Sequence, residues 1–161
     1  MSAFAVRAAV PADIDAIGRL GALLVAEHHD FDRLRFIPAT AETARGYGAY
    51  LGTQLAEPQV VVLVAEDSGQ VVGYAYAGLE GHDYMQLRGP AGALYDIVVE
   101  PRSRGRGIGR ALLDRVLEEL AARGAPRIVL STAAPNEAAQ RIFTRAGFRR
   151  TMIEMTRELD E

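Results

Sequence analysis

Residues 97–112 read Ile97-Val98-Val99-Glu100-Pro101-Arg102-Ser103-Arg104-Gly105-Arg106-Gly107-Ile108-Gly109-Arg110-Ala111-Leu112, and this stretch decides the fold. It begins as a β-branched strand, passes through a turn rich in arginine and glycine, and ends as an amphipathic helix. Glycine lets the backbone approach a ligand, and the first helical turn offers N–H groups that have no partner inside the helix. The stretch therefore predicts a phosphate-binding turn.

Four arginines crowd the start of this predicted helix: Arg102, Arg104, Arg106 and Arg110. A helix N-terminus already carries partial positive charge, so each added cation costs about a few tenths of a kcal/mol unless an anion is bound. We expect local frustration here without a ligand. A tight connection with solvated arginines is the alternative, and it ranks second because a simple turn needs only one or two glycines.

The composition sets the general class of the protein. The chain has 161 residues, of which 49% are hydrophobic and 24% charged, and this predicts one soluble globular domain over residues 1–161. A formal charge of −3 argues against a general nucleic-acid binder, so we expect a small ligand at the arginines. The absence of cysteine fits a cytoplasmic protein and excludes thiolate chemistry. With no long apolar run and no signal peptide, we expect no membrane association.

Strand and helix patterns alternate along the chain. The hydrophobic periodicity predicts strands over residues 3–9, 59–66, 71–79, 94–100, 127–132 and 148–159. Helices are predicted over residues 11–27, 40–56, 108–123 and 136–146, the last with Asn136 as its N-cap. The two strands after residue 58 form an antiparallel hairpin, and the strand at 127–132 is expected to be buried.

Two motifs stand at a spacing that one family shares. Arg104-Gly105-Arg106-Gly107-Ile108-Gly109 matches an Arg/Gln-x-x-Gly-x-Gly/Ala signature between strand and helix. Downstream, Asn136-Glu137-Ala138-Ala139 leads to Ala146-Gly147-Phe148, an Asn-x-x-Ala to Gly-Phe pattern. With Asp96 to Pro101 as the strand before the first motif, the chain resembles the GNAT superfamily of acyl-CoA-dependent N-acetyltransferases over nearly its whole length.

The resemblance implies an α/β (α+β) fold with a splayed, mostly antiparallel mixed sheet and helices on both faces. The strands around Val98 and Leu130 would part to admit the pantetheine arm of acetyl-CoA, which is the acyl-donor substrate. A parted sheet leaves backbone N–H and C=O groups without ladder partners, and the amides of pantetheine would satisfy them. No metal is expected.

The resemblance also assigns binding roles. The N–H of Val99 would donate to the oxyanion, and the N–H groups from Arg104 to Gly109 would bind the pyrophosphate. The residues expected to contact acetyl-CoA are Ile97, Val98, Val99, Arg104, Gly105, Arg106, Gly107, Ile108, Gly109, Arg110, Asn136 and Phe143.

Acetyl transfer to an amine needs a general base, because the attacking nitrogen must be neutral. Asp96 and Tyr95 are the first candidates, and Val99 completes the expected catalytic set. Strand alternation places Tyr95 on one face and turns Asp96 to the other unless a bulge intervenes. A structural role for Asp96, bonding the nearby backbone, is an equal alternative. Further candidates for the base are Glu27, His28 and His29.

The family's usual general acid, a tyrosine in the last helix, is replaced here by Phe143. Core packing is its expected role, so the thiolate would leave unaided or take a proton from another hydroxyl. Acidic residues in the two segments that border the acceptor in this family suggest a cationic amine: Glu27, Asp30, Asp32, Glu80 and Asp83. A polyamine, an aminoglycoside-like compound, an amino acid or a protein amine all remain open, and by family habit we expect a homodimer.

Other functional classes fit less well. A dinucleotide-binding fingerprint needs Gly-x-Gly-x-x-Gly and an acidic residue after the next strand, where this chain has Leu130-Ser131-Thr132. A kinase-type P-loop needs Gly-Lys-Ser/Thr, which the chain lacks. A non-catalytic acyl-CoA-binding sensor or interaction module on the same fold remains the alternative function.

Overall fold

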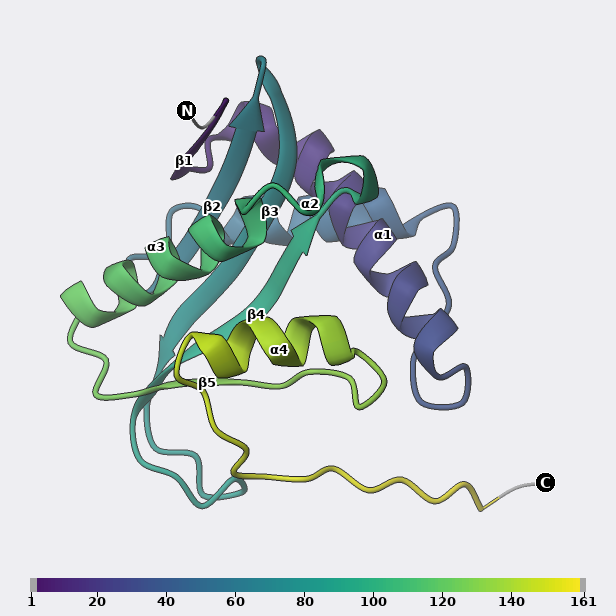
Figure 1. The fold of residues 1–161 in the computed structure, drawn as a ribbon, viewed down its shortest axis with the longest axis vertical. Helices are drawn as coiled ribbons and strands as arrows, with labels where there is room; N and C mark the ends of the chain where they lie inside the picture. The colour runs from purple at the N-terminus through teal and green to yellow at the C-terminus, as the bar shows by residue number, and fades with distance from the viewer. Residues whose placement is uncertain (1–2, 160–161) are drawn as a thin grey trace.

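The structure is a computed structural model that describes residues 3–159 and contains one five-stranded sheet in the order β1-β2-β3-β4-β5 (Figure 1). The first four strands pair antiparallel with their neighbours, and β4 and β5 pair parallel. The strands are β1 (Phe4–Ala8), β2 (Val60–Asp67), β3 (Gln70–Glu80), β4 (Ala91–Val99) and β5 (Ile128–Leu130). The helices are α1 (Ile14–Phe31), α2 (Thr43–Gln54), α3 (Ile108–Ala122) and α4 (Glu137–Arg145), with 3₁₀ turns η1 (Pro11–Asp13) and η2 (Pro101–Ser103).

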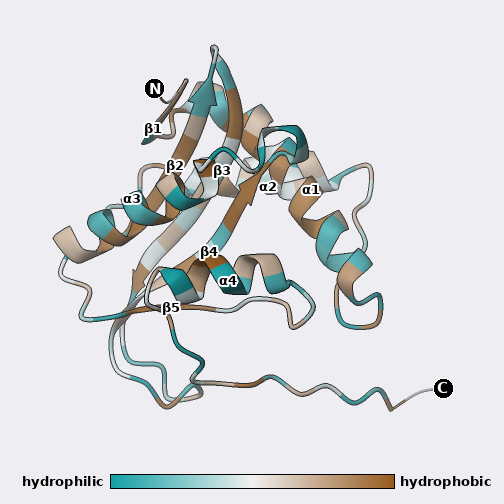
Figure 2. Cartoon of the chain, in the orientation of Figure 1, coloured by the Kyte–Doolittle hydropathy of each residue, from teal (hydrophilic) through white to brown (hydrophobic). Residues whose placement is uncertain are grey.

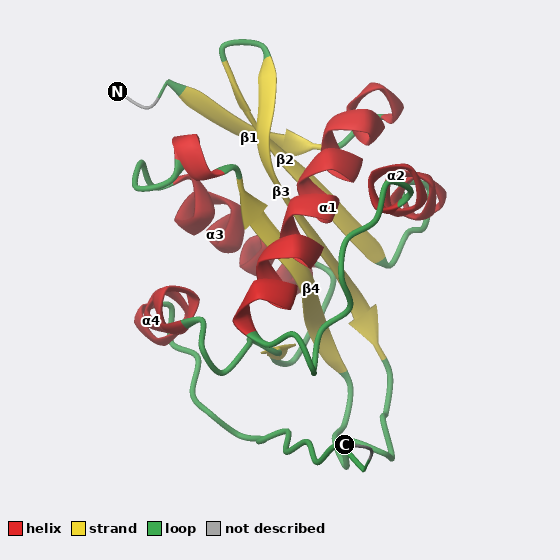
Figure 3. Cartoon of the chain, turned by 90° about the vertical axis from the view of Figure 1, so that its right-hand side faces the viewer, coloured by secondary structure: helices red, strands yellow, loops and turns green. Residues whose placement is uncertain are grey.

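Helices cover both faces of the sheet, as the family resemblance implied (Figure 3). On one face, Ile17 and Leu20 of α1 and Leu51 of α2 pack with strand residues such as Val64 and Val98. On the other face, the apolar stripe of α3 packs against β2, β3 and β4, and Phe143 of α4 joins the same cluster. We refer to these as the α1/α2 face and the α3 face.

Helices α1 and α2 approach closely because glycine stands at their contact. A Cβ placed on Gly18 would lie 2.3 Å from the carbonyl oxygen of Ala44, and one on Gly48 would lie 3.0 Å from the carbonyl oxygen of Ile14. Any side chain at Gly18 would force the helices apart. This contact fixes α2 against α1 and so positions Tyr47, which belongs to the site described below.

Strands β4 and β5 part after a short pairing. Their register joins Gly92 to Ile128, Ala93 to Val129 and Leu94 to Leu130, and the rest of β4 has no β5 residue beside it. The expected splayed mixed sheet is confirmed. The side of β4 that faces β5 is consequently open from residue 95 onward.

Several sequence predictions of element bounds were wrong. Residues 148–159 do not form a strand, because within the described chain no strand lies alongside to pair with them. The strand expected at 127–132 is limited to β5 and is half-buried rather than buried. Helix α1 continues through His28 and His29 to Phe31, α2 begins at Thr43 and ends at Gln54, and β4 begins at Ala91.

Candidate active site

A β-bulge at Tyr95 organises the centre of β4. Tyr76 of β3 pairs with Asp96, whereas the next residue, Ala77, pairs with Leu94, so Tyr95 is the extra residue. Both Tyr95 and Asp96 consequently contact the α1/α2 face: the Tyr95 ring lies 4.8 Å from that of Tyr76, and Asp96 bonds Tyr47 and Tyr74. Strict alternation would direct Asp96 to the α3 face, and the bulge directs it to the α1/α2 face instead.

Two tyrosine hydroxyls hold the Asp96 carboxylate. The hydroxyl of Tyr47, from α2, donates to Oδ2 at 2.6 Å, and the hydroxyl of Tyr74, from β3, donates to the same oxygen at 3.0 Å. The alternative in which Asp96 bonds nearby backbone is not what the structure has. Pattern analysis missed both tyrosines, although a tyrosine at a core-facing position is a signal, because its hydroxyl needs a partner when buried.

Burial raises the pKa of Asp96 above its ordinary value, while the two tyrosine hydroxyls and the nearby charge of His28 act in the opposite direction. The carboxylate also affects its donors. Burial and the negative charge of Asp96 raise the pKa values of Tyr47 and Tyr74, so both phenols stay protonated donors. The group that results is a desolvated carboxylate held by neutral hydrogen bonds, which is suited to accepting a proton.

Tyr95 is tied to a different carboxylate. Its hydroxyl donates to Glu80 Oε2 at 2.5 Å, and Arg88 pairs with the other oxygen of Glu80. Burial and the bond to Glu80 raise the pKa of Tyr95, so this phenol is unsuited to act as a base near neutral pH. Between the two candidates on β4, the structure favours Asp96.

The bulge also determines where the N–H of Val99 points. Before the bulge, Gly92 N–H donates to Arg127 O, so even-numbered N–H groups face β5. After it, Glu100 N–H donates to Val72 O, so even-numbered groups face β3 and odd-numbered ones face the open side. The Val99 carbonyl points to the same open side, since it accepts a hydrogen bond from Arg104 Nε at 2.8 Å. The N–H of Val99 therefore points to where β5 has parted.

The glycine turn has the backbone that its sequence predicts. Gly105 and Gly107 have φ of +78° and +84°, in the left-handed region, and an added Cβ at either position would meet open space. The helical ladder of α3 begins with Ala111 N–H bonding Gly107 O, so the N–H groups of residues 108–110 lie ahead of it. Arg104 differs from expectation, because its N–H donates to Pro101 O.

The predicted frustration among the arginines was wrong, because each of the four has a carboxylate partner. Arg104 pairs with Glu27 at 2.7 Å and Arg106 with Asp67 at 2.6 Å, and both partners come from other elements. Arg102 pairs with Glu100 and Arg110 with Asp114, which are local partners. The sequence showed the cations together and did not show that the fold brings acids to them.

The other candidates for the base are partly engaged. Glu27 is bound by Arg104, while Nδ1 of His28 bonds Leu24 O and Nδ1 of His29 bonds Phe36 O, each at 2.8 Å. His28 remains close enough to Asp96 to influence its pKa. The end of α1 therefore borders the Asp96 site, while its three candidate side chains are bound to other partners.

Asn136 and Phe143, which the sequence analysis expected to contact acetyl-CoA, make contacts that stabilise α4 and its packing. Asn136 caps the helix, because its Oδ1 accepts the N–H of Ala139 at 3.2 Å. Phe143 is buried in the α3-face cluster, 6.0 Å from the ring of Phe148. Ile97 and Val98 lie on opposite faces of β4, Val98 buried among α1/α2-face residues and Ile97 against the α3-face cluster.

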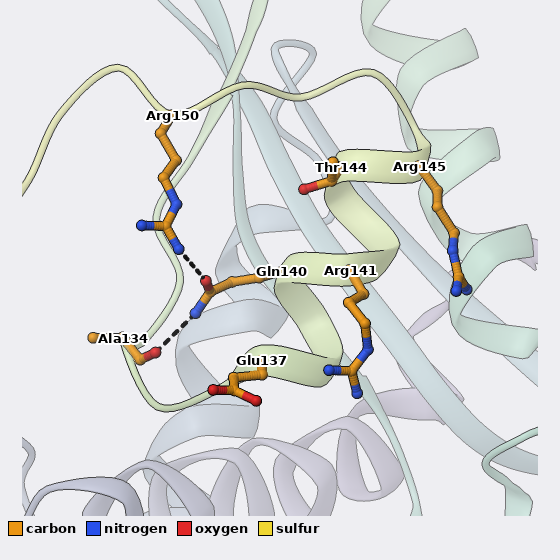
Figure 4. A pocket seen from close by; sticks show the side chains of 7 residues that line it. All are labelled: Ala134, Glu137, Gln140, Arg141, Thr144, Arg145 and Arg150. Carbon is orange, nitrogen blue, oxygen red and sulfur yellow. Dashed lines mark hydrogen bonds between the residues drawn. The ribbon is translucent and has the colours of Figure 1, made fainter.

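A cavity of about 470 Å³ lies on α4 beside the start of the C-terminal segment (Figure 4). Within it, Gln140 donates to Ala134 O and accepts a bond from Arg150. Its lining contains none of the residues predicted from sequence; it consists of Ala134, Glu137, Gln140, Arg141, Thr144, Arg145 and Arg150.

Over residues 3–159 no three His, Asp or Glu side chains gather in a way that would hold a metal ion. In the same range, no helix is both long and apolar enough to cross a membrane.

Solved structures share this architecture. A Bacillus halodurans protein matches with a TM-score of 0.80 at 21% identity, covering 96% of this chain and 99% of that one. A predicted acetyltransferase with acetyl-CoA from Clostridium acetobutylicum matches with a TM-score of 0.74 at 22% identity, covering 97% and 96%. An aminoglycoside acetyltransferase from an uncultured soil metagenomic sample matches with a TM-score of 0.67 at 24% identity, covering 99% and 100%.

The sequence itself matches one family. The profile of the acetyltransferase (GNAT) family aligns with residues 25–148, which include the bulged strand, the glycine turn and α4. The parted strands and the glycine turn lie within the matched residues, and the chain belongs to the GNAT acetyltransferase family.

Proposed function

We propose that the protein transfers an acetyl group from acetyl-CoA to a primary amine of a cationic small-molecule acceptor by direct attack on the thioester. The observation that carries this proposal is the bulged β4, which offers the N–H of Val99 to the open side and the half-buried Asp96 carboxylate to the α1/α2 face. One strand thus supplies a donor for developing negative charge and an acceptor for a proton.

In the reaction, the neutral amine nitrogen attacks the thioester carbonyl carbon, and a C–N bond forms as the C–S bond breaks. The electron pair of that bond leaves on sulfur as the CoA thiolate, which needs no protein acid because the pKa of a thiol is about 8.5. The proton lost by nitrogen passes to Asp96. The Val99 N–H donates to the carbonyl oxygen while it carries negative charge.

The glycine turn would bind the pyrophosphate. Residues 108–110 present N–H groups at the start of α3, and Gly105 and Gly107 leave open space for phosphate oxygens. Arg106 and Arg110 are partly exposed and would exchange their carboxylate partners for phosphate. Charge-assisted bonds of this kind are short and strong.

The surroundings of Tyr95 favour a cationic acceptor. Tyr95 and Tyr50 are 44% and 55% exposed, and the ring of Tyr76 lies between them, 4.8 Å from the first and 6.3 Å from the second. Aromatic rings attract ammonium groups, and the Glu80 carboxylate adds negative charge beside them. Solved relatives that include aminoglycoside acetyltransferases support a small-molecule amine.

The test is a panel of polyamines, aminoglycosides, amino acids and a lysine peptide at fixed acetyl-CoA, read as free thiol. We expect release with di- or polycationic amines and little with the amino acids. Release confined to the lysine peptide would contradict the small-molecule acceptor. Acetyl-CoA binding without release on any amine would identify the protein as the sensor.

The role of Asp96 is tested by Asp96→Asn, with Asp15→Asn as the matched control because Asp15 is exposed on α1. A general base contributes about 10²–10⁴ in rate, so we expect a loss in that range and disappearance of the acidic limb of the pH–rate profile. A profile unchanged in shape and height would dismiss Asp96 and direct the search to His28.

A further inference from the structure

The side chain of Arg104 joins the open side of β4 to the end of α1. Its Nε donates to the carbonyl oxygen of Val99 at 2.8 Å, and its Nη2 donates to Oε1 of Glu27 at 2.7 Å. The guanidinium is a rigid plane with several N–H donors, so one group makes both bonds at once. A change that moves Arg104 away from Val99 therefore also changes the surroundings of Glu27.

The binding site for acetyl-CoA under the proposed function overlaps the position of Arg104. The carbonyl oxygen of Val99 lies on the open side of β4, where backbone groups need partners from an extended ligand. Arg104 is also the first residue of the glycine turn, and a guanidinium binds phosphate through strong charge-assisted hydrogen bonds. Both features favour an exchange in which Arg104 leaves Glu27 for the donor.

Glu27 has no second cation to take the place of Arg104. Its side chain is 30% exposed, and within residues 3–159 its carboxylate pairs with Arg104 alone. A half-buried carboxylate is partly removed from water, so losing its cation costs free energy unless another cation replaces it. Release of Arg104 consequently produces a site for a positively charged group.

Glu27 lies beside the proposed reaction centre. A single guanidinium spans Glu27 and Val99, so Oε1 of Glu27 is within about 8 Å of the Val99 carbonyl oxygen. The next residue, His28, is near enough to Asp96 for its charge to act on the pKa of that carboxyl. The last turns of α1 are hydrophilic here, whereas its earlier turns are hydrophobic (Figure 2). A cation at Glu27 would therefore be next to an amine that reacts between Val99 and Asp96.

We propose that Glu27 binds a second, non-reacting cation of the acceptor, and that Arg104 masks Glu27 in the free protein until acetyl-CoA engages Arg104. This inference rests on the proposed function, which supplies the anionic donor and the cationic acceptor. The donor and the acceptor then strengthen each other's binding by the same factor, because a coupling free energy between two sites is reciprocal. Glu27 thus favours acceptors that carry at least two cationic groups.

Asp67 provides the matched comparison for Glu27. It pairs with Arg106 of the same turn at 2.6 Å, a geometry close to that of the Glu27 pair at 2.7 Å. Asp67 is paired with the first residue of β3, whereas Asp96 is paired with the seventh. At about 3.4 Å per residue, Asp67 is about 20 Å from the reaction centre. Replacing Asp67 consequently frees an arginine of the turn without altering the acceptor side.

The first experiment measures CoA binding by calorimetric titration into the whole chain. Glu27→Gln should bind CoA about two- to fivefold more tightly than the wild type, because a partly exposed ion pair no longer holds Arg104. Asp67→Asn should show a gain of similar size through Arg106. Glu118→Gln controls for the change in net charge, because Glu118 is exposed in the second half of α3, and its CoA affinity should equal that of the wild type. Unchanged affinity in Glu27→Gln, or an equal gain in Glu118→Gln, overturns the masking.

The second experiment titrates spermidine into the protein alone and into the protein saturated with CoA, which carries no acetyl group and permits no turnover. Attraction between the charges of CoA and spermidine is common to every variant. The gain in spermidine affinity that CoA produces should therefore be about two- to fivefold larger in the wild type and in Asp67→Asn than in Glu27→Gln. Equal gains in the three proteins overturn the role of Glu27 in acceptor binding. Failure of the proposed function has a different signature, which is the absence of thiol release with every amine of the panel.

Discussion

Removing the Tyr47 hydroxyl provides the sharpest test of the active site. Tyr47→Phe keeps the ring against Gly21 of α1 but deletes the 2.6 Å bond to Asp96, which stabilises the charged carboxylate. A hydrogen bond to a charged group contributes about 1.5–3 kcal/mol. At about 1.36 kcal/mol per pKa unit, the pKa of Asp96 should rise by about one to two units.

The assay is kcat/KM against pH, measured as thiol release. Since the base must be ionised to accept a proton, the acidic limb should move to higher pH by the same one to two units. At a pH well below that limb, the variant should be about tenfold or more slower than the wild type, and at high pH the two should converge. Tyr74→Phe, which removes the longer bond, should move the limb in the same direction by less.

Tyr50→Phe is the matched control, because its hydroxyl lies 3.2 Å from that of Tyr76 and does not contact Asp96. Its acidic limb should coincide with that of the wild type. If Tyr47→Phe is folded and its limb does not move, the group that titrates in the reaction is not Asp96, and the reasoning from the bulge fails.

Four further outcomes are expected. Gly107→Glu should weaken acetyl-CoA binding by well over tenfold in calorimetric titration, because it adds negative charge at a left-handed position beside the expected pyrophosphate; unchanged affinity in a folded variant would place the pyrophosphate elsewhere. Gly18→Ala should destabilise the fold by about 1–3 kcal/mol in denaturant unfolding. Gly46→Ala is the control, because a Cβ there meets open space, and it should stabilise the fold by about 0.5–1 kcal/mol. Equal effects of the two substitutions would refute the close approach of α1 and α2. Phe143→Leu should keep kcat within about tenfold of the wild type while it lowers the melting temperature, and a hundredfold loss in a folded variant would mean that the ring positions the thioester. The pKa of Asp96 is raised in the folded state, so its contribution to stability is complete below the unfolded pKa of about 3.9 and is lost as pH rises through the folded pKa. The melting temperature of Asp96→Asn relative to the wild type should therefore increase across that pH window.

The sequence predicted what depends on local pattern. The glycine turn, the hairpin between β2 and β3, and the start of α4 at Asn136 all follow from short-range signals, and each lies where the pattern places it. The parted sheet came from resemblance rather than from periodicity. The coarse fold was therefore within reach of the sequence alone.

The missing parts depend on contacts between distant segments. Nothing near Arg104 in the sequence indicates that Glu27 will pair with it, and nothing near Asp96 indicates Tyr47. The failed strand at 148–159 has the same origin, because the alternating pattern is present while no strand of the described residues pairs with it. Periodicity identifies a strand-forming segment and cannot say what it pairs with.

The bulge on β4 consists of one extra residue, Tyr95, and the directions of Asp96 and the Val99 N–H depend on that bulge rather than on the Tyr95 side chain. Replacing the side chain, as in Tyr95→Phe, leaves the count unchanged, so Asp96 and the N–H of Val99 keep their directions. Deleting Tyr95 removes the extra residue itself, so the flanking residues would pair in regular alternation and both groups would still keep their directions. Both groups turn together only when the bulge is lost with Tyr95 still present, because strict alternation then directs Asp96 toward the α3 face and the N–H of Val99 toward β3.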